Sequence, residues 1–563
     1  MKRNYFIFLL LMCQTVNAQV ITQKVTDNAM KGLAFETPFR SLPKYPQPDL
    51  QKIFKEDVAS SELPERIAVG FDVNIDLQLE KPNYGDKGKA WSVKLEADKS
   101  RFLSLFFDDL YLPKGSELYI YNRKNQVVVG PLDYTNTSES RTFQMGLIKG
   151  EELTLTLIET PAAFGKSRVH VKTLFYGYKE SSEDGGGFGQ SVVCNTDENV
   201  NCPVGAPFAQ QSDAVAMILL NNDQSLRHCS ATLLNNACQN LRPNLLTAFH
   251  CVDRQTRDGV LTNAERADVG NFGFVFQYKS PICSNANGSL SLTFSGSTIL
   301  SEWNQTDFIL LSLNSRPSPN SGIRYAGWDR SNVNPTSSAG IHHPAGDVMK
   351  IAIDGQASTL FTWNNTRQGF SPNLTDGYWE QNFDSGATEG GSSGSALFDQ
   401  NRRVVGQLRG NQHRTQLGTE CTDRRAHYGR LAFSWTGGGT SASRLSDHLS
   451  DDPSVMTTNT MGIPSFGLPD EICANTPISY LNFPPNMNLI GGSIVGVNMT
   501  GWLAGLEPQS GYNGEGHLEF QFKPNGITCN DPLIVRKDFW VGPPLAPQIS
   551  FTPFVECYGF TIC

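Results

Sequence analysis

The placement of the cysteines constrains this chain more than any other feature. The sequence has 12 cysteines among 563 residues, and none lies between Cys13 and Cys194. Twelve is high for a cytosolic protein and too few for a small domain held together by disulfides alone. No C-x-x-C pair occurs, so the cysteines are not spaced like a metal-binding set. We therefore expect a large secreted protein with disulfides confined to its later part.

The N-terminus has the layout of a secretory signal peptide. Lys2 and Arg3 precede an apolar run over residues 5–12, and small residues close the segment 1–18. Such a run is too short to span a bilayer. A lipoprotein site at Cys13 is the alternative, but the methionine before this cysteine is a poor fit. Removal of residues 1–18 leaves eleven cysteines, so one cysteine must stay unpaired or pair outside the chain.

Composition narrows the class of partner. The net charge is −9, which argues against a protein that holds nucleic acid through phosphate contacts. Hydrophobic residues make up 39% of the chain, enough for real cores. No later segment approaches the ~20 apolar residues of a membrane helix. We expect protein or peptide partners, without nucleic acid or a membrane span.

Alternating apolar and polar residues predict β-strands in the first block. The alternation is clear at residues 91–95 and 153–157, and turn signals separate such segments between residues 67 and 178. Short strands at this spacing are typical of a β-sandwich. The acidic, glycine-rich run 181–187 then predicts a linker, after which the cysteines begin.

Three separated motifs in the second block form a catalytic set. His250 ends an apolar strand, Asp307 precedes another, and Ser393 lies in a turn of small residues over 390–397. Serine is a weak nucleophile, so an imidazole must take its proton and a carboxylate must orient that imidazole. The order His, Asp, Ser is that of double-barrel serine proteases.

The second block resembles secreted bacterial lysyl endopeptidases, which are chymotrypsin-like serine proteases. The resemblance implies Ser393 as nucleophile, His250 as general base and Asp307 as the orienting carboxylate. It also implies an oxyanion hole made by the N–H groups of Gly391 and Ser393. The motifs that carry it occur in order across about half the chain, at residues 191–203, 247–251, 341–347, 388–395, 403–408, 428–430 and 434–439.

Some neighbouring residues offer other interpretations. Ser392 and Ser395 compete with Ser393 as nucleophile, but the Gly-x-Ser-Gly alignment favours Ser393. His342 and His343 could suggest a metal site. Adjacent residues of a strand point to opposite faces, so they do not simply share one ion. We expect both histidines to be structural, with no metal and no cofactor.

The resemblance also assigns cysteine pairs. It implies that Cys229 bonds Cys251 beside the general base, and that two further bridges tie the start of the mature enzyme to its body, Cys194 to Cys421 and Cys202 to Cys283. Cys238 has no partner in the family. Four C-terminal cysteines also lack one, and we expect them to pair within or beyond the C-terminal region: Cys473, Cys529, Cys557 and Cys563.

The sequence departs from the family at the specificity residues. Ala426 and Ala387 stand at the two positions where lysine-binding relatives carry an acid. A buried ammonium without a carboxylate is strongly unfavourable. Asp423 and Asp384 lie nearby in sequence and could substitute. We expect a small or neutral first subsite.

A second departure lies at Arg409, where the family has a histidine. Arginine at this wall could attract an acidic side chain, but we expect it to point into solvent. A third is Ser392, which replaces the aspartate that pairs with the new N-terminus in trypsin-like zymogens. We therefore expect activation to depend on removing the leader block.

The predicted architecture is mainly β: a double six-stranded β-barrel protease domain between two β-sandwiches. The N-terminal sandwich resembles the pro-regions of these proteases, with a permanent binding module as the alternative, and the third block resembles PKD-like immunoglobulin modules. The expected product is a secreted monomeric endopeptidase with its own pro-region as inhibitor or chaperone; the alternative is a non-catalytic adhesion or binding protein on a protease fold. The segments are 1–18 signal peptide, 19–185 leader and pro-region, 186–450 protease, 451–469 linker, 470–545 PKD-like module, and 546–563 the start of a further module or a truncated tail.

Overall fold

The computed structural model confirms that the chain is mainly β, with 43% of residues in strands and 12% in helices. The predicted signal peptide 1–18, the glycine-rich run 181–187, and Cys473, Cys557 and Cys563 lie outside the described residues. No described helix is long and apolar enough to cross a membrane. The described residues are 20–25, 40–60, 63–79, 82–85, 88–179, 191–195, 198–283, 286, 288, 292–364, 372–414, 418–468, 471–472, 479–500 and 505–542.

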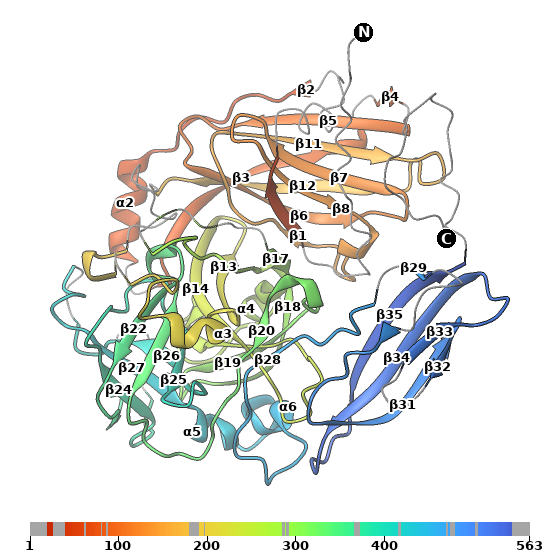
Figure 1. Cartoon of the computed structure of the whole chain (residues 1–563). Helices are drawn as coiled ribbons and strands as arrows, with labels where there is room; N and C mark the ends of the chain where they lie inside the picture. Colours follow the sequence, from red (N-terminus) through yellow and green to blue (C-terminus); the bar gives the residue numbers. More distant parts are fainter. Residues whose placement is uncertain are drawn as a thin grey trace.

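The first block folds as two packed β-layers (Figure 1, red to orange). Its core consists of apolar side chains that face inward from both layers, such as Leu105, Leu155 and Leu174, each fully buried. The alternation read from the sequence arises because successive strand residues point to opposite faces. The elements are β1 (Val20–Lys24), β2 (Arg40–Ser41), α2 (Leu50–Ala59), β3 (Arg66–Asp76), β4 (Asn83–Gly85), β5 (Gly88–Glu96), β6 (Phe102–Tyr111), β7 (Ser116–Asn122), β8 (Val127–Leu132), β9 (Phe143–Gln144), β10 (Ile148–Lys149), β11 (Glu152–Glu159) and β12 (Arg168–Gly177).

The second block begins with a sheet that contains two of the three predicted catalytic residues near the ends of its strands. β13 pairs with both β14 and β16, while β15 joins β14 to β19. The elements are α3 (Ala209–Ser212), β13 (Val215–Asn221), β14 (Ser225–Leu234), β15 (Asn244–Ala248), α4 (Asn263–Asp268), β16 (Gly273–Phe276), β17 (Leu292–Ser295), β18 (Ser297–Trp303) and β19 (Phe308–Leu313).

A second sheet of seven strands follows, in the order β22-β21-β25-β26-β27-β24-β23 among the described residues. Trp328, Phe398 and Leu431 are fully buried in a core that joins this sheet to the preceding one. The elements are β20 (Arg324–Tyr325), β21 (Ser338–His342), β22 (Lys350–Asp354), β23 (Thr359–Phe361), β24 (Tyr378–Asn382), β25 (Ala396–Asp399), β26 (Val404–Gly410), β27 (Arg425–Arg430), α5 (Leu431–Thr436) and α6 (Ser446–Leu449).

The segment predicted as a linker after residue 450 packs against the barrels. β28 (Met461–Gly462) pairs with β20, and Thr458 N donates to Trp328 O at 2.9 Å. The short helix α6 begins only after an extended residue. The backbone is extended at Arg444, and the N–H of Leu445 donates to Ser434 O at 3.0 Å.

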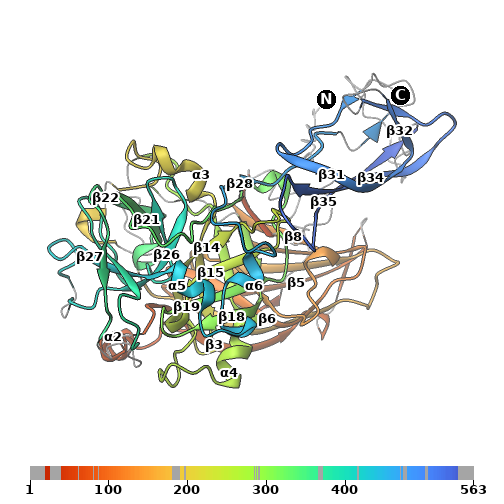
Figure 2. The same ribbon diagram turned by 90° about the horizontal axis from the view of Figure 1, so that it is seen from below.

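The C-terminal block stands to one side of the rest (Figure 2, blue). A four-stranded sheet, β29-β35-β34-β31, faces a three-stranded one, β30-β33-β32. Phe520, Phe522 and Leu533 lie in the core between them. The elements are β29 (Glu471–Ile472), β30 (Ser479–Tyr480), β31 (Met487–Val495), β32 (Val497–Thr500), β33 (Gly505–Pro508), β34 (Gly514–Pro524) and β35 (Leu533–Val541).

The structure supplies a cysteine partner that the sequence left open. Cys529 does not pair within the C-terminal block but bonds Cys238 of the second block, across 291 residues of sequence. An ion pair between Arg242 and Asp531, 2.8 Å long, lies beside this bridge. The family pattern could not reveal the pair, because the family offers no partner for Cys238.

The first block also shares hydrogen bonds with the second. β3 extends the sheet of β14, with Ala68 opposite Leu226 and Val69 opposite Ser225. β1 likewise pairs with β17 through Val20 and Thr293. Among the described residues, these two antiparallel strand pairs therefore join the first block to the second through backbone hydrogen bonds.

Candidate active site

His250 and Asp307 are brought together by the pairing of β15 with β19. Ala248 lies opposite Phe308, so the residues just beyond these two strand ends meet. His250 Nδ1 lies 2.8 Å from Asp307 Oδ2, and the backbone N–H of His250 donates to Asp307 Oδ1 at 3.0 Å. The Asp307 carboxylate is buried, and two bonds to one residue fix both the imidazole and the chain that carries it.

Ser393 completes this arrangement from the turn that precedes β25, in the seven-stranded sheet. Its Oγ lies 2.9 Å from His250 Nε2. Two backbone bonds hold the serine turn: Ser230 N donates to Ser393 O, and Gly394 N donates to Leu408 O, each at 2.8 Å. Gly394 has a φ of +83°, and a Cβ there would lie 2.1 Å from Thr247 Oγ1, so this position requires glycine.

The predicted oxyanion donors lie on the same turn. Gly391 adopts a φ of +87°, and a Cβ on it would lie 1.9 Å from His228 Nε2. The carbonyl of Gly391 is held by Ser230 Oγ at 2.9 Å. Among the hydrogen bonds of the described residues, the N–H groups of Gly391 and Ser393 have no protein acceptor. Both donors can therefore bind a substrate oxygen.

Three disulfides join the pairs that the resemblance implied. Cys229–Cys251 spans only 22 residues and clamps β14 to the residue that follows His250. The other two attach the start of the second block to distant parts of it, and they are Cys194–Cys421 and Cys202–Cys283.

Arg409 does not point into solvent, so this expectation is wrong. Its side chain is buried, and one guanidinium nitrogen lies 3.9 Å from Asp307 Oδ1. The guanidinium stacks over Trp363, 4.5 Å from the ring centroid, and donates to Tyr378 Oη at 3.2 Å. A planar cation is stable here because aromatic faces and a buried carboxylate surround it. The sequence alone did not indicate that Trp363 and Tyr378 would lie around Arg409.

The two alanines of the predicted first subsite are buried, and nearby carboxylates have other partners. Asp423 binds Arg425 through both oxygens, at 2.8 and 3.1 Å. Asp384 accepts from Gly355 N at 2.8 Å. Ala426 and Ala387 themselves are fully buried. Asp423 is therefore already paired with a cation, whereas Asp384 is exposed and accepts from a backbone amide.

The histidine pair lies behind the serine turn. His342 Nδ1 is 2.7 Å from Ser392 Oγ, and His343 Nδ1 is 3.0 Å from Asp347 O. Burial lowers the pKa of His342 to about 3 and that of His343 to about 4. Both rings are therefore neutral at ordinary pH, and each contacts a different group.

His228 is a residue that sequence reasoning missed. It is fully buried against Gly391, and burial lowers its pKa to about 3. Its backbone N–H donates to Glu65 O of the first block at 3.1 Å. A signal was available, since His228 directly precedes Cys229 on the strand that faces the serine turn.

Glu389 links this turn to the start of the second block. Its carboxylate accepts from Val192 N at 3.0 Å and from Asn195 Nδ2 at 2.9 Å. Burial outweighs these bonds and raises the pKa of Glu389 to about 7. The pKa of Glu389 is thus higher in the folded protein than the value of about 4.5 in the unfolded chain. Its protonated form therefore contributes stability that is fully present below about pH 4.5 and is lost as the pH rises through about 7.

We therefore expect Glu389→Gln to flatten the stability profile. Relative to the wild type, the variant should gain about 2 kcal/mol between pH 5 and pH 8, because glutamine stays neutral. Urea unfolding at both pH values measures this difference. The exposed Glu139→Gln serves as control and should leave the profile unchanged; parallel profiles for Glu389→Gln and the wild type would contradict the prediction.

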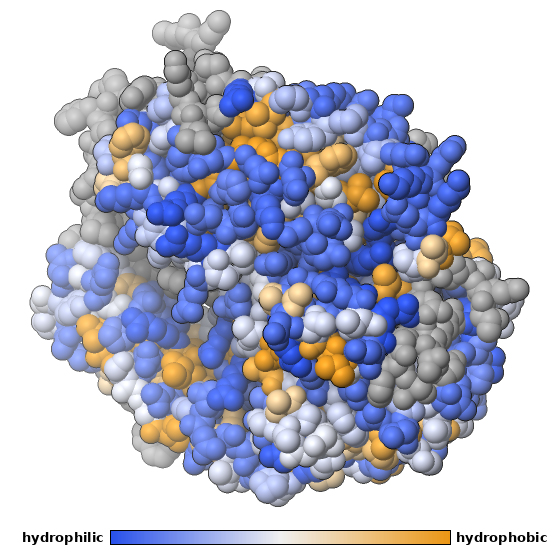
Figure 3. Space-filling view, turned by 180° about the vertical axis from the view of Figure 1, so that it is seen from behind, coloured by the Kyte–Doolittle hydropathy of each residue, from blue (hydrophilic) through white to orange (hydrophobic). Residues whose placement is uncertain are grey.

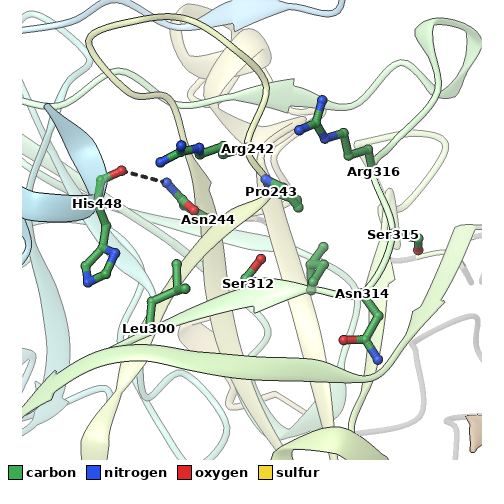
Figure 4. Close-up of a pocket in the computed structure, with 10 residues that line it drawn as sticks. Arg242, Pro243, Asn244, Leu300, Ser312, Asn314, Ser315, Arg316 and His448 are labelled. Atoms are coloured by element: carbon green, nitrogen blue, oxygen red, sulfur yellow. Dashed lines mark hydrogen bonds between the residues drawn. The ribbon is translucent and has the colours of Figure 1, made fainter. Parts of the chain in front are cut away.

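The second block also contains a cavity that none of the three predicted catalytic residues lines. It has a volume of about 400 Å³, and its Asn244 donates to the backbone oxygen of His448 at 3.1 Å (Figure 4). Arg242 at its edge is already paired with Asp531. The face seen from behind is mostly polar, with apolar residues in small separate groups (Figure 3).

Residues 188–428 match the lysyl endopeptidase C-terminal domain family. This match covers less than half of the chain, includes all three predicted catalytic residues, and supports a serine protease in that region.

Solved structures with some likeness are also proteases by title. The Rv3671c protease of M. tuberculosis in an inactive form has 14% identity and a TM-score of 0.27, over 44% of this chain and 93% of that one. The thermostable serine protease AL20 from an extremophilic microorganism has 15% identity and a TM-score of 0.26, over 39% and 92%. The MamO protease domain of Magnetospirillum magneticum has 9% identity and a TM-score of 0.24, over 39% and 93%. Likenesses at this level support no argument about this chain.

Proposed function

We propose that this chain is a secreted serine endopeptidase. The observation that carries the proposal is the continuous contact from Ser393 Oγ to His250 Nε2, at 2.9 Å, and from His250 Nδ1 to Asp307 Oδ2, at 2.8 Å. Disulfides and the signal-like N-terminus support an oxidising, extracellular destination.

In the proposed reaction, Ser393 Oγ attacks the peptide carbonyl as its proton passes to His250. The carbonyl oxygen becomes an oxyanion held by the N–H groups of Gly391 and Ser393. Collapse breaks the C–N bond, and His250 gives its proton to the leaving amine. Water then attacks the acyl-enzyme and loses a proton to His250, the acid product leaves, and that proton returns to Ser393.

A fluorophosphonate probe tests the proposal, because it reacts only with an activated serine. The mature enzyme should be labelled stoichiometrically, and Ser393→Ala should not be labelled. No labelling of the wild type after removal of the N-terminal block would overturn the proposal and favour a binding protein on a protease fold.

We infer a first subsite that accepts small or neutral side chains. Ala426 and Ala387 provide no charge, and Asp423 is held by Arg425. A lysine ammonium in such a subsite would lose its water without gaining a counter-charge. Cleavage of a peptide mixture, read by mass spectrometry, should show cuts after small or neutral residues. Strict cleavage after lysine would contradict this inference.

The N-terminal block is the proposed inhibitor of the site, and β3 is the part that carries this role. Its start lies along β14, where His228 N donates to Glu65 O and Arg227 Nη1 donates to Pro64 O at 2.6 Å. Ser230 follows His228 by two residues on β14, and its N–H donates to Ser393 O. The edge of β14 that pairs with the first block therefore lies beside the nucleophile. A strand already paired there excludes a substrate strand from the same edge.

A contact beneath the serine turn supports the same role. Lys179, near the end of the first block, forms a partly buried ion pair with Glu65. A Cβ on Gly390 would lie 3.2 Å from Glu65 Oε2, so this carboxylate borders the turn. The Glu65 carboxylate of the first block therefore lies beside the serine turn, while the backbone of the same residue is bonded to β14.

Release of this block should raise activity. A recognition site for a specific protease can be introduced into residues 181–187. Cleavage at this site should increase kcat/KM by about tenfold or more, because each 1.4 kcal/mol of inhibitory binding that is lost corresponds to a factor of ten. The control is the uncut chain treated with inactivated protease. Equal activity before and after complete cleavage and removal of the block would contradict an inhibitory role.

A further inference from the structure

Three side chains of the seven-stranded sheet converge close to Ala426 of the predicted first subsite. Glu380 belongs to β24, His427 to β27, and His413 to the loop that follows β26. Glu380 and His427 lie directly opposite each other in antiparallel strands, so their side chains share one face. One ligand atom from each of the three residues lies within 4.8 Å of the other two.

The distances suit a small ion between the three groups. His427 Nε2 is 2.9 Å from Glu380 Oε2, and His413 Nε2 is 3.5 Å from the same oxygen. Ligands at about 2.0–2.1 Å from a tetrahedral Zn²⁺ are about 3.3 Å apart. Both histidines therefore present a ring nitrogen to one carboxylate at nearly the spacing that the ion imposes.

The buried histidine can adopt the tautomer that a metal needs. His427 Nδ1 lies 3.2 Å from Gly410 O and 3.3 Å from Gln412 N. Without an ion, Nδ1 can accept from Gln412 while Nε2–H donates to Glu380. With an ion at Nε2, Nδ1–H can donate to Gly410 O, which is the usual outer contact of a metal-bound imidazole. Neither form leaves the ring without a partner.

The surroundings are closed on one side and open on the other. His427 is fully buried, with its ring centroid 4.0 Å from that of Phe361. Trp363 packs edge-on against His427, with centroids 5.7 Å apart. The side chain of His413 is 36% exposed, which leaves a route for entry and room for solvent as a fourth ligand.

We propose that Glu380, His413 and His427 form a binding site for Zn²⁺ or a similar divalent transition metal. Two imidazoles and one carboxylate favour such ions over Mg²⁺ and Ca²⁺, which prefer oxygen ligands. The two histidines are 14 residues apart in sequence, a spacing that matches no metal-binding motif.

The site lies next to parts of the predicted active site but does not depend on its activity. His427 follows Ala426 on β27. Trp363 contacts the His427 ring and also stacks against the guanidinium of Arg409. The metal proposal therefore concerns binding, and it stands whether or not the chain is a peptidase.

Calorimetric titration of the full chain with Zn²⁺ tests the proposal, in a Ser393→Ala background that prevents self-cleavage. We expect one equivalent to bind at neutral pH and to raise the Tm, since the ion binds the native state. His413→Ala should weaken binding by about tenfold or more. Added Co²⁺ should give visible absorption bands typical of nitrogen and oxygen ligands, and these should be lost in the same variant. Mg²⁺ should not bind.

Two further variants keep the outcome clear. His413 is partly exposed, so its substitution should leave the far-UV circular dichroism unchanged, and Glu380→Gln removes a ligand with little change of shape. His170→Ala is the matched control, because His170 also contacts a carboxylate, that of Asp108, but has no third ligand close by among the described residues. Absence of Zn²⁺ binding, or equal binding by wild type and His413→Ala, would overturn the proposal.

Discussion

Ser393→Ala is expected to lower kcat/KM for a peptide substrate by about 10⁶-fold in the released enzyme. The hydroxyl is the only group of the serine turn within hydrogen-bond distance of His250 among the described residues, so its loss removes the nucleophile and the proton that His250 would take. Residual turnover should come from the oxyanion donors and substrate binding alone. Initial rates with a fluorogenic peptide measure the effect.

A neighbouring serine provides the control for this result. Ser395 is buried two residues further along, and its backbone N–H bonds Ser392 O at 3.1 Å. Ser395→Ala should therefore retain activity within about tenfold, since it removes no group that contacts His250. If Ser395→Ala or Ser392→Ala, and not Ser393→Ala, abolished turnover with the fold intact, the assignment of the nucleophile would be wrong.

Asp307→Asn is expected to reduce kcat by about 10⁴-fold with a small change in KM. An amide in this place can present N–H to His250 Nδ1, which would stabilise the tautomer that carries its proton on Nε2. Such an imidazole cannot accept the proton of Ser393. The substitution also removes the negative charge that lies 3.9 Å from the guanidinium of Arg409, so a buried cation loses its counter-charge.

The fold should tolerate this substitution well enough for the measurement. Asp307 has a φ of +61°, a left-handed conformation that asparagine adopts as readily as aspartate. Asp423→Asn is the matched control, because Asp423 pairs with a partly exposed arginine and, among the described residues, forms no hydrogen bond or ion pair with His250. Steady-state kinetics of both variants decide the point: equal kcat for Asp307→Asn and the wild type would contradict an orienting role.

The local parts of the site were predictable because their signals are local. The glycine-rich turn around Ser393 needs residues without a Cβ at Gly391 and Gly394, and the sequence shows that need directly. His250 directly follows an apolar run and Asp307 directly precedes one, so each lies beside the end of a strand. The motifs together resemble a known family, and that resemblance implied three cysteine pairs that the structure also contains.

Features that depend on contacts between distant segments were not predictable in the same way. Arg409 was expected at the surface because arginine usually lies there, yet Trp363 and Tyr378 enclose it beside Asp307. The sequence did not identify a partner for Cys529 or for Cys238, and the structure bonds them to each other. In each case the deciding neighbour comes from another strand or block, and nothing near the residue in sequence indicates it.

The distribution of cysteines by itself indicated a secreted protein with a cysteine-free first block and a disulfide-bonded second one, since oxidised pairs need an oxidising compartment. Hydrophobic alternation by itself determined a mainly β fold, because strand side chains alternate between core and solvent. Only the tertiary structure decided that β3 pairs with β14, that Cys238 bonds Cys529, and that His413 and His427 converge on Glu380. The physical reason is that these contacts depend on register and packing between segments far apart in the chain, which no local pattern encodes.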